Sequence, residues 1–437
     1  MKLNNKFRPA EILIFSYGAV GLLGTLLLML PGAATGQTSF LQAWFTAVSA
    51  LTVTGLTVVP TASHWTMFGQ TVLLILMQIG GLGLMVFTTI FFMALGLRIQ
   101  LAHRALIVQD RNTFSMAGIL RLVKSIIILT LIIEGVGALL MAFLTPNLWD
   151  KGIGEGLFFV IFQSVSAFNG VGLDVTGQSL IIYRSYPALL CVYMVLIFLG
   201  SLGYVVLQEI LVLRKWRRMS LHSRLVFWVT GMIIFIGTIF YFFSEYQRLL
   251  ADLDLPGKIV ESLFQAVTRT AGFTTVAVNN WTEPFIFLMI MMMFIGASPG
   301  SVGGGIKTTT VGTIILAIWA IARGRKEVVL WEREIAPESV TKAFTVAVIA
   351  MLLVSFSTLL IMVIEKLPFM PVLFEVVSAL ATVGLSMGIT GELSPFGQIL
   401  LTILMFIGRI GVLSLVIFLT KQEQRRLRYL KEDILIG

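Results

Sequence analysis

A short segment that ends in a glycine recurs four times along this chain of 437 residues. The copy at 45–56 (FTAVSALTVTGL) aligns without gaps with 162–173 (FQSVSAFNGVGL), and 374–385 (FEVVSALATVGL) follows the same template. The copy at 266–273 (AVTRTAGF) is a looser match. A repeat period of about 100 residues, with one glycine in each copy, predicts four-fold pseudo-symmetry around a shared feature.

Each copy lies between two apolar runs that are long enough to cross a bilayer. The chain is 57% hydrophobic and 12% charged, with a mean hydropathy of +0.95, and a water-soluble fold cannot bury that much apolar surface. The glycine-ending segments span only about a dozen residues, too few to cross, so we expect re-entrant pore helices. The predicted fold is an all-α polytopic membrane protein of four membrane–pore-loop–membrane repeats, with eight transmembrane helices and four re-entrant helices around one central pore.

Each unit is expected to contain an outward run, a pore helix and a returning run, in this order. For the first to the fourth unit these segments are 12–30, 40–51 and 67–97; 125–144, 156–168 and 187–213; 225–243, 259–269 and 284–322; and 343–364, 371–381 and 396–420. The corresponding repeats are 1–110, 111–220, 221–335 with an intramembrane loop at 297–310, and 336–437, which includes a cytosolic C-terminal tail.

The basic residues predict how the chain is oriented in the membrane. Of the 31 lysines and arginines, 23 lie in the five segments 1–10, 97–124, 214–224, 323–343 and 421–437. This bias places these segments and both termini in the cytoplasm, where their basic runs would meet lipid headgroups or a cytosolic partner. The net charge of +9 therefore does not indicate nucleic-acid binding. The first apolar run lacks a cleavage pattern, so no cleaved signal peptide is expected.

The opposite face is predicted to be acidic. Its segments carry eleven acidic residues, among them Asp174, Asp252 and Glu261, which would raise the local concentration of cations. Ordinary solvation of loops explains any single one of them equally well. One cysteine and three histidines exclude a disulfide framework and a thiolate metal site, and make a His-rich metal centre unexpected. We expect no covalent cofactor and no enzymatic chemistry.

The four glycine-ending loops are predicted to form a cation filter. Irregular backbone at membrane depth persists only where it lines water or is buried in protein, and rings of carbonyl oxygens can replace the hydration shell of a cation. Glycine adopts positive φ at little cost, and the pore helices would direct their partially negative C-terminal ends at the ion. No carboxylate lies within these stretches, although Asp174 is placed at the mouth. The predicted filter residues are Thr52, Val53, Thr54, Gly55, Asn169, Gly170, Val171, Gly172, Thr270, Ala271, Gly272, Thr382, Val383 and Gly384.

A second glycine pattern marks the returning runs. The sequences IGGLG (79–83), LGSLG (199–203), IGASPG (295–300) and IGRIG (407–411) follow their filter glycines by 25, 28, 24 and 24 residues. Close packing of helices through small residues is one explanation for most of these glycines, and a functional role in the returning runs stays open. Close packing does not explain Arg409, which stands where the other units have a small residue.

The loop at 297–310 interrupts the third returning run with glycines. A phosphate-binding loop is excluded because Ile306 separates the last glycine from Lys307 and no strand precedes it. We expect instead a flexible plug or hinge below the filter.

An arginine at membrane depth must face water, an anion or carbonyl groups. Arg409 is thus predicted to form a constriction together with this loop, and an ion pair with Glu134 or Glu209 is the alternative. The predicted gating residues are Gly300, Gly303, Gly304, Gly305, Lys307 and Arg409.

These motifs together resemble the Trk/Ktr/HKT superfamily of potassium-translocating proteins, in particular the bacterial Ktr-type (KtrB-like) membrane subunit. The four filters, Arg269 in TRTAGF, the 297–310 loop and Arg409 carry the resemblance, which covers nearly the whole chain. It implies four units around one pore, with K+ bound at the filter residues named above, because all four units have the filter glycine. Members with serine at the first glycine position tend toward Na+. It also implies that the loop gates the pore, and Arg269 is expected to hold loop carbonyls that support the filter.

The resemblance also implies partners and a location. The chain is expected in the bacterial cytoplasmic (inner) membrane as a homodimer that docks a cytosolic ring of KtrA-type RCK subunits. That ring, rather than this chain, would bind ATP or ADP. Modulation by Na+ stays open. So does an obligately coupled Na+/K+ or H+/K+ symporter, with Glu134 as its coupling residue. A membrane enzyme acting on lipids would need clustered acids or a histidine pair near one interface, and the sequence offers none.

Overall fold

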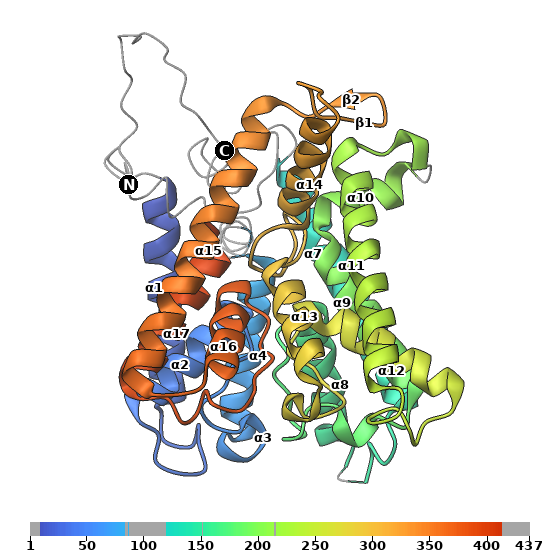
Figure 1. Cartoon of the computed structure of the whole chain (residues 1–437). Helices are drawn as coiled ribbons and strands as arrows, with labels where there is room; N and C mark the ends of the chain where they lie inside the picture. Colours follow the sequence, from blue (N-terminus) through green and yellow to red (C-terminus); the bar gives the residue numbers. More distant parts are fainter. Residues whose placement is uncertain (1–8, 84–85, 87–118, 151, 214–215, 413–437) are drawn as a thin grey trace.

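The computed structural model describes residues 9–83, 86, 119–150, 152–213 and 216–412, and these residues are mostly helical (Figure 1). The predicted cytosolic tail, most of the basic segments at 1–10 and 97–124, and the inner ends of the first and fourth returning runs lie outside the described residues.

The first two units follow the predicted order. The first contains α1 (Pro9–Leu28), α2 (Phe40–Leu51), α3 (Thr61–His64) and α4 (Met67–Leu82). The second contains α7 (Ile119–Leu144), α8 (Ile153–Phe168), the 3-10 turn η1 (Ile181–Tyr183), α9 (Pro187–Leu202), α10 (Tyr204–Leu213) and the 3-10 turn η2 (Trp216–Arg218).

The last two units repeat this order with additions. The third contains α11 (Leu221–Glu245), α12 (Leu255–Val267), the 3-10 turns η3 (Thr268–Thr270) and η4 (Val278–Asn280), α13 (Glu283–Phe294) and α14 (Thr308–Ala322). A hairpin of β1 (Val329–Leu330) and β2 (Arg333–Glu334), paired antiparallel, leads to the fourth, with α15 (Pro337–Glu365), α16 (Phe369–Ala381) and α17 (Pro395–Ile410).

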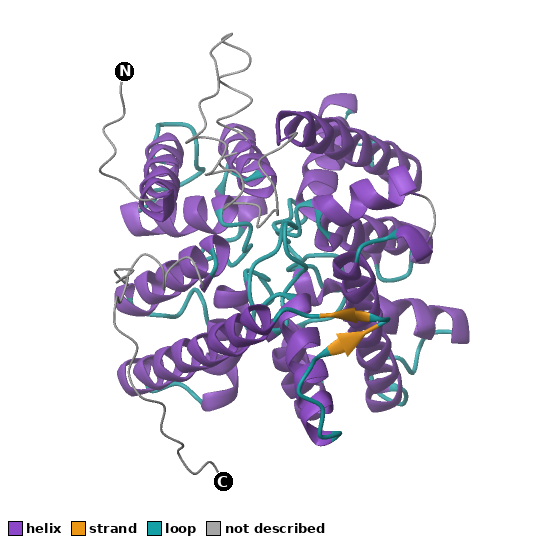
Figure 2. Ribbon diagram, turned by 90° about the horizontal axis from the view of Figure 1, so that it is seen from above, coloured by secondary structure: helices purple, strands orange, loops and turns teal. Residues whose placement is uncertain are grey.

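The short helices of all four units are directed at the centre of the molecule. Each of α2, α8, α12 and α16 packs against the outward helix of its own unit, α1, α7, α11 or α15. Ser39 begins α2 with a capping box that includes Gln42, and the side chain of Asp254 caps α12 at the backbone N–H of Gly257. Viewed from above, the helices surround a centre that is occupied by loops (Figure 2).

Several helices have the length and composition of membrane spans. In the described part, α11, α15 and the 123–144 portion of α7 are each long and apolar enough to cross a membrane alone. The pair α9 and α10 passes only when joined, and the two helices are bent by 99°. Large apolar side chains such as Phe143 (80% exposed) and Val363 (75% exposed) face outward, as expected for contact with lipid. The chain is therefore a mostly helical, multi-pass membrane protein.

Three of the returning helices end at a glycine that lies inside the run predicted from the sequence. Helices α4, α9 and α17 end at Gly83, Gly203 and Gly411, whose φ angles are 82°, 92° and 95°. Side chains disfavour such angles, so glycine permits each break. In the third unit the chain leaves helix between α13 and α14, close to the predicted loop. In the second unit α10 follows Gly203, and the bend of 99° between α9 and α10 was not predicted from the sequence.

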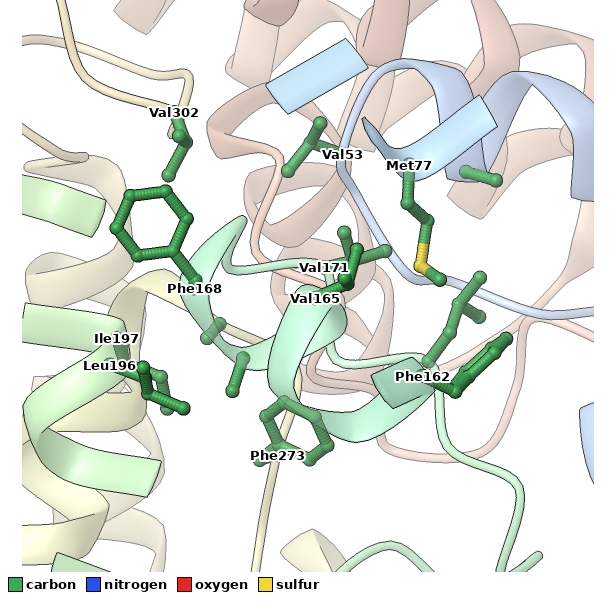
Figure 3. Close-up of a cluster of buried hydrophobic side chains, with 14 of the residues drawn as sticks. Val53, Met77, Phe162, Val165, Phe168, Val171, Leu196, Ile197, Phe273 and Val302 are labelled. Atoms are coloured by element: carbon green, nitrogen blue, oxygen red, sulfur yellow. The ribbon is translucent and has the colours of Figure 1, made fainter. Parts of the chain in front are cut away.

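Buried apolar side chains fix the pore helices in place. Around α8, Val165 and Phe168 lie among Leu196 and Ile197 of α9 and Phe273, which follows the third filter segment (Figure 3). These side chains belong to different units. Phe273 belongs to the third unit and the other four side chains to the second, so the packing links these two units.

Candidate functional site

The four predicted filter segments, at 52–55, 169–172, 270–272 and 382–384, meet in a closed ring. A Cβ atom added to the glycine of any segment would fall within 3.0 Å of the backbone of the next one. The closest approaches are Gly55 to the Val171 oxygen (1.7 Å), Gly172 to the Gly272 Cα (2.3 Å), Gly272 to the Gly384 carbonyl carbon (3.0 Å), and Gly384 to the Thr54 oxygen (2.2 Å). The order around the ring is the order of the units in the sequence. Side chains at Gly55, Gly172 and Gly384 would collide with backbone, and a side chain at Gly272 would make a tight contact.

The backbone of three filter segments has alternating left-handed residues. The filter glycines Gly55, Gly172 and Gly384 have φ of 87°, 80° and 92°, and the residues two before them, Val53, Gly170 and Thr382, have φ of 61°, 65° and 51°. Valine is β-branched and adopts positive φ at a cost, so the surrounding structure must impose this conformation. The expectation that glycine supplies a positive φ holds for these three segments. It is wrong for Gly272, which has no positive φ.

The third segment is built differently from the others. It follows the 3-10 turn η3, which contains Arg269, a side chain that is only 2% exposed. Its Nη1 donates to the carbonyl oxygens of Met292 (3.2 Å), Ile295 (2.5 Å) and Gly296 (3.3 Å). These carbonyls belong to the C-terminal end of α13, where a helix leaves its last acceptors unsatisfied. Arg269 therefore joins the third filter segment to the end of α13.

A cavity of about 430 Å³ lies next to the four glycines and is lined by residues from all four units. Asp174 is on its wall and accepts from the backbone N–H groups of Thr176 (3.2 Å) and Gly177 (3.0 Å), as well as from the Thr176 hydroxyl. Burial raises the pKa of the Asp174 carboxyl above its ordinary value, and these hydrogen bonds act in the opposite direction. The placement of Asp174 beside the glycines matches the sequence prediction.

The glycines of the returning helices bring those helices against the ends of the pore helices. An added Cβ would meet a backbone oxygen of the preceding pore helix at 2.1 Å or less: Gly80 that of Leu51, Gly200 that of Phe168 and Gly408 that of Leu380. The residues that carry these three oxygens, Leu51, Phe168 and Leu380, each lie four residues before a filter glycine. Close packing is thus the role of these glycines, and it leaves no room for a methyl group.

Replacing Gly200 with alanine should therefore separate α9 from α8 and lower the free energy of unfolding by about 1–3 kcal/mol, the usual cost of overpacking. Thermal unfolding of the purified protein in detergent would measure it. Gly231→Ala is the matched control, because a Cβ at this α11 position meets nothing within 4 Å. Alanine is a better helix former than glycine, so the control should keep or raise the melting temperature. Equal melting temperatures for both variants would contradict the packing argument.

The loop at 295–307, between α13 and α14, lies against the end of the filter segments that adjoins the pore helices. The backbone N–H of Val302 donates to the Gly200 carbonyl (3.3 Å), and that of Gly304 donates to the Thr382 hydroxyl (2.7 Å). The Nζ of Lys307 donates back to the Gly303 carbonyl at 2.6 Å. Hydrogen bonds thus connect a loop of the third unit to Gly200 near the end of α9 in the second unit and to Thr382, the C-cap of α16, in the fourth.

Arg409 connects the same loop to the first unit. Its Nη1 donates to the carbonyl oxygen of Val302 in the loop, and its Nη2 donates to the carbonyl oxygen of Gly80 in α4. The alternative of an ion pair is wrong for the described residues. Glu134 accepts from Gln78 and Asn169, and Glu209 accepts from Ser220 instead. Carbonyl groups are the partners, one of the environments expected for an intramembrane arginine.

Sequence reasoning missed the buried carboxylates behind the filter. Glu375 in α16 accepts from the Ser386 hydroxyl (2.6 Å), the Met387 N–H (2.9 Å) and the Thr390 hydroxyl (2.8 Å), and so holds the loop after the fourth segment. Glu261 was assigned to the acidic outer face but is 1% exposed, with the Arg184 Nε at 3.8 Å. Both glutamates lie within apolar pore-helix segments, and that position was the available signal.

Comparison with known proteins identifies what the chain is similar to. A family described as TrkH, cation transport protein, matches residues 5–428. The Ktr system potassium uptake protein B of Bacillus subtilis (strain 168) is 37% identical over 436 residues, which cover 99% of this chain and 97% of that protein. The protein of the same name from Vibrio alginolyticus is 33% identical, covering 98% and 94%. The potassium/sodium uptake protein NtpJ of Enterococcus hirae is 31% identical, covering 100% and 99%.

Among solved structures, the crystal structure of the potassium transporter TrkH from Vibrio parahaemolyticus superposes with a TM-score of 0.76 at 18% sequence identity. The match covers 97% of this chain and 88% of that one. The two proteins therefore share a fold over nearly the full length.

Proposed function

The chain belongs to the TrkH family of cation transport proteins, and from this membership we propose that it takes up K+ across the bacterial cytoplasmic membrane. The family transports ions, so the membrane-enzyme alternative is set aside. The observation that carries the proposal is the ring in which each filter glycine contacts the backbone of the next segment. The relatives with 37% and 33% identity are named as potassium uptake proteins, which supports K+ as the cargo.

In this proposal K+ is bound by backbone carbonyls of the four filter segments. Carbonyl oxygens that replace the hydration shell one for one make entry nearly free of cost for the ion that fits. The C-terminal ends of four pore helices add partial negative charge without a carboxylate that would hold the ion too tightly. The relative named as a potassium/sodium uptake protein makes the preference between these two ions the property to measure.

The gate in this proposal is the 295–307 loop together with Arg409. The guanidinium places a fixed positive charge in the cation pathway, and its two hydrogen bonds hold Val302 of the loop and Gly80 of α4 in place. A cation crossing here must pass both the charge and the chain. The loop opens, in this proposal, when a cytosolic RCK-type (KtrA-like) ring that binds ATP or ADP acts on a homodimer of this chain. Modulation by Na+ would act on the same equilibrium.

Replacing Arg409 with alanine is expected to raise K+ uptake about threefold to tenfold, since a tenfold change corresponds to about 1.4 kcal/mol of barrier. Uptake of K+ into cells, at matched amounts of protein in the membrane, is the measurement. Arg323→Ala serves as the control, because this arginine ends α14 and stacks on Trp319 at 4.6 Å, away from the loop. Uptake that is unchanged or lower in Arg409→Ala would remove Arg409 from the gate.

The proposal is tested by complementation of a host that lacks its own K+ uptake. The wild-type chain should restore growth at low external K+, and the purified protein should pass K+ into liposomes without a Na+ or pH gradient. An obligately coupled symporter would not transport K+ into liposomes that have no Na+ or pH gradient. The symporter is the weaker alternative because Glu134, its natural coupling residue, uses both carboxylate oxygens to accept hydrogen bonds from Gln78 and Asn169. Failure of wild-type uptake under every gradient would overturn both versions.

A further inference from the structure

Glu134 joins two units behind the filter. It lies in α7 and is 6% exposed. Its Oε2 accepts from the Nε2 of Gln78 in α4 (3.0 Å), and its Oε1 accepts from the Nδ2 of Asn169, the first residue of the second filter segment (2.9 Å). One carboxylate thus holds a returning helix of the first unit and a filter segment of the second.

Asn169 is confined from several sides. Its Nδ2 also donates to the Val165 carbonyl at 2.9 Å, which fixes the orientation of the amide. On the other side, a Cβ added to Gly81 would lie 1.6 Å from the Asn169 Oδ1, so α4 packs directly on this amide. A contact this close leaves Asn169 little freedom to turn away. Movement of the carboxylate would therefore be transmitted to the filter backbone.

The other units hold the matching position by other means. Thr52 bonds to the Val48 carbonyl (2.8 Å) and to Thr54 (2.8 Å) within its own segment, and Arg269 donates to the end of α13. In the fourth unit this position is Ala381, which has no polar side chain. Among these four described positions, only the second depends on a carboxylate from a separate transmembrane helix.

The carboxylate is not needed to neutralise a cation. Within the described residues, the ion pairs formed by carboxylates involve Arg184 and Arg248 and do not include Glu134. A buried carboxylate without a cationic partner is costly, and its hydrogen bonds to two amides offset only part of that cost. A neutral side chain of similar size would be cheaper for stability alone. The presence of a carboxylate at position 134 therefore indicates a role in the filter.

The same turn of α4 also reaches the gate. Gln78 and Gly81 flank Gly80, whose carbonyl accepts from Arg409. We propose that Glu134 is a positioning residue of the filter, which holds Asn169 against α4 and thereby maintains the ion preference of the second segment. This inference rests on the proposed K+ uptake function and adds a specificity-determining contact to it.

The test compares the Na+ to K+ uptake ratio of the wild type, Glu134→Gln and Glu134→Asp at matched membrane amounts. The first variant keeps the length and replaces one acceptor oxygen by an amide nitrogen, and the second keeps both oxygens and withdraws them from Gln78 and Asn169. Both should lose about threefold to tenfold of the preference for K+, because the net free energy of one intramolecular hydrogen bond corresponds to a change of this order. Glu209→Gln is the matched control: this carboxylate lies in α10, accepts from Ser220 rather than from a filter residue, and should leave the ratio unchanged.

A double-mutant cycle identifies the route. Asn169→Ala should reproduce the loss, and adding Glu134→Gln to it should have no further effect on the ratio. Wild-type ratios in both Glu134 variants would overturn the inference, as would additive losses in the cycle. A lower melting temperature with an unchanged ratio would assign Glu134 a structural role only, which also overturns it. Lack of K+ uptake by the wild type would instead defeat the proposed function.

Discussion

Gly55→Ser is expected to lower the preference for K+ over Na+ on the order of 100-fold, a change that corresponds to about 2.8 kcal/mol. Two costs combine at this position. The φ of 87° is unfavourable for serine, and the added Cβ would lie 1.7 Å from the Val171 oxygen, a backbone atom of the adjacent segment. The oxygen must move, so the ring that would coordinate K+ changes shape. The measurement is the ratio of Na+ to K+ uptake in the complemented host.

A control separates backbone strain from the collision. Gly32→Ser introduces the same side chain at a φ of 90°, in a loop where a Cβ meets nothing within 4 Å. This variant should lose some stability but keep the ion ratio of the wild type. If Gly55→Ser also keeps the wild-type ratio while the protein is present in the membrane, Gly55 does not belong to the filter.

The architecture was predictable because membranes restrict structure to few solutions. Apolar runs must be helices in lipid, and short segments cannot cross, so the order of outward, pore and returning segments follows from hydropathy and length. The breaks at Gly83, Gly203 and Gly411 were not predicted. Small residues in a membrane helix serve both close packing and kinks, and their spacing alone does not distinguish these uses. The φ angles of these glycines and the 99° bend after α9 distinguish them.

The candidate site was predictable where repeats could be compared. Matching the four copies selected the filter glycines and made Arg409 conspicuous, since no other unit has a charge at its position. The partners of Arg409 were not predictable. Its guanidinium donates to the backbone carbonyls of Val302 and Gly80. Because every residue has a backbone carbonyl, the residue types at these positions do not indicate the contact. The network of Glu134 was missed because its members lie 35 and 56 residues apart.

Deleting residues 300–308 should raise K+ uptake about tenfold or more, because it removes the chain that lies against the inner end of the filter. The deletion takes away Val302, which accepts from Arg409, and Gly304, which donates to the Thr382 hydroxyl at 2.7 Å. It also removes Lys307, whose Nζ folds back on the Gly303 carbonyl at 2.6 Å. The gain should exceed that of Arg409→Ala, since that variant loses the charge and two hydrogen bonds but keeps the chain in the pathway.

The combination of the two changes tests whether they act on one barrier. Adding Arg409→Ala to the deletion should raise uptake by less than it does in the full-length chain, because the hydrogen bond to Val302 no longer exists. Deletion of the exposed hairpin 329–334, which includes β1 and β2, controls for the loss of a chain segment and should leave uptake near the wild-type rate. Normal or abolished uptake by a well-inserted loop deletion would mean that the loop does not close the pathway, and abolished uptake would mean that it supports the filter. Arg409 would then be a brace between α4 and the loop.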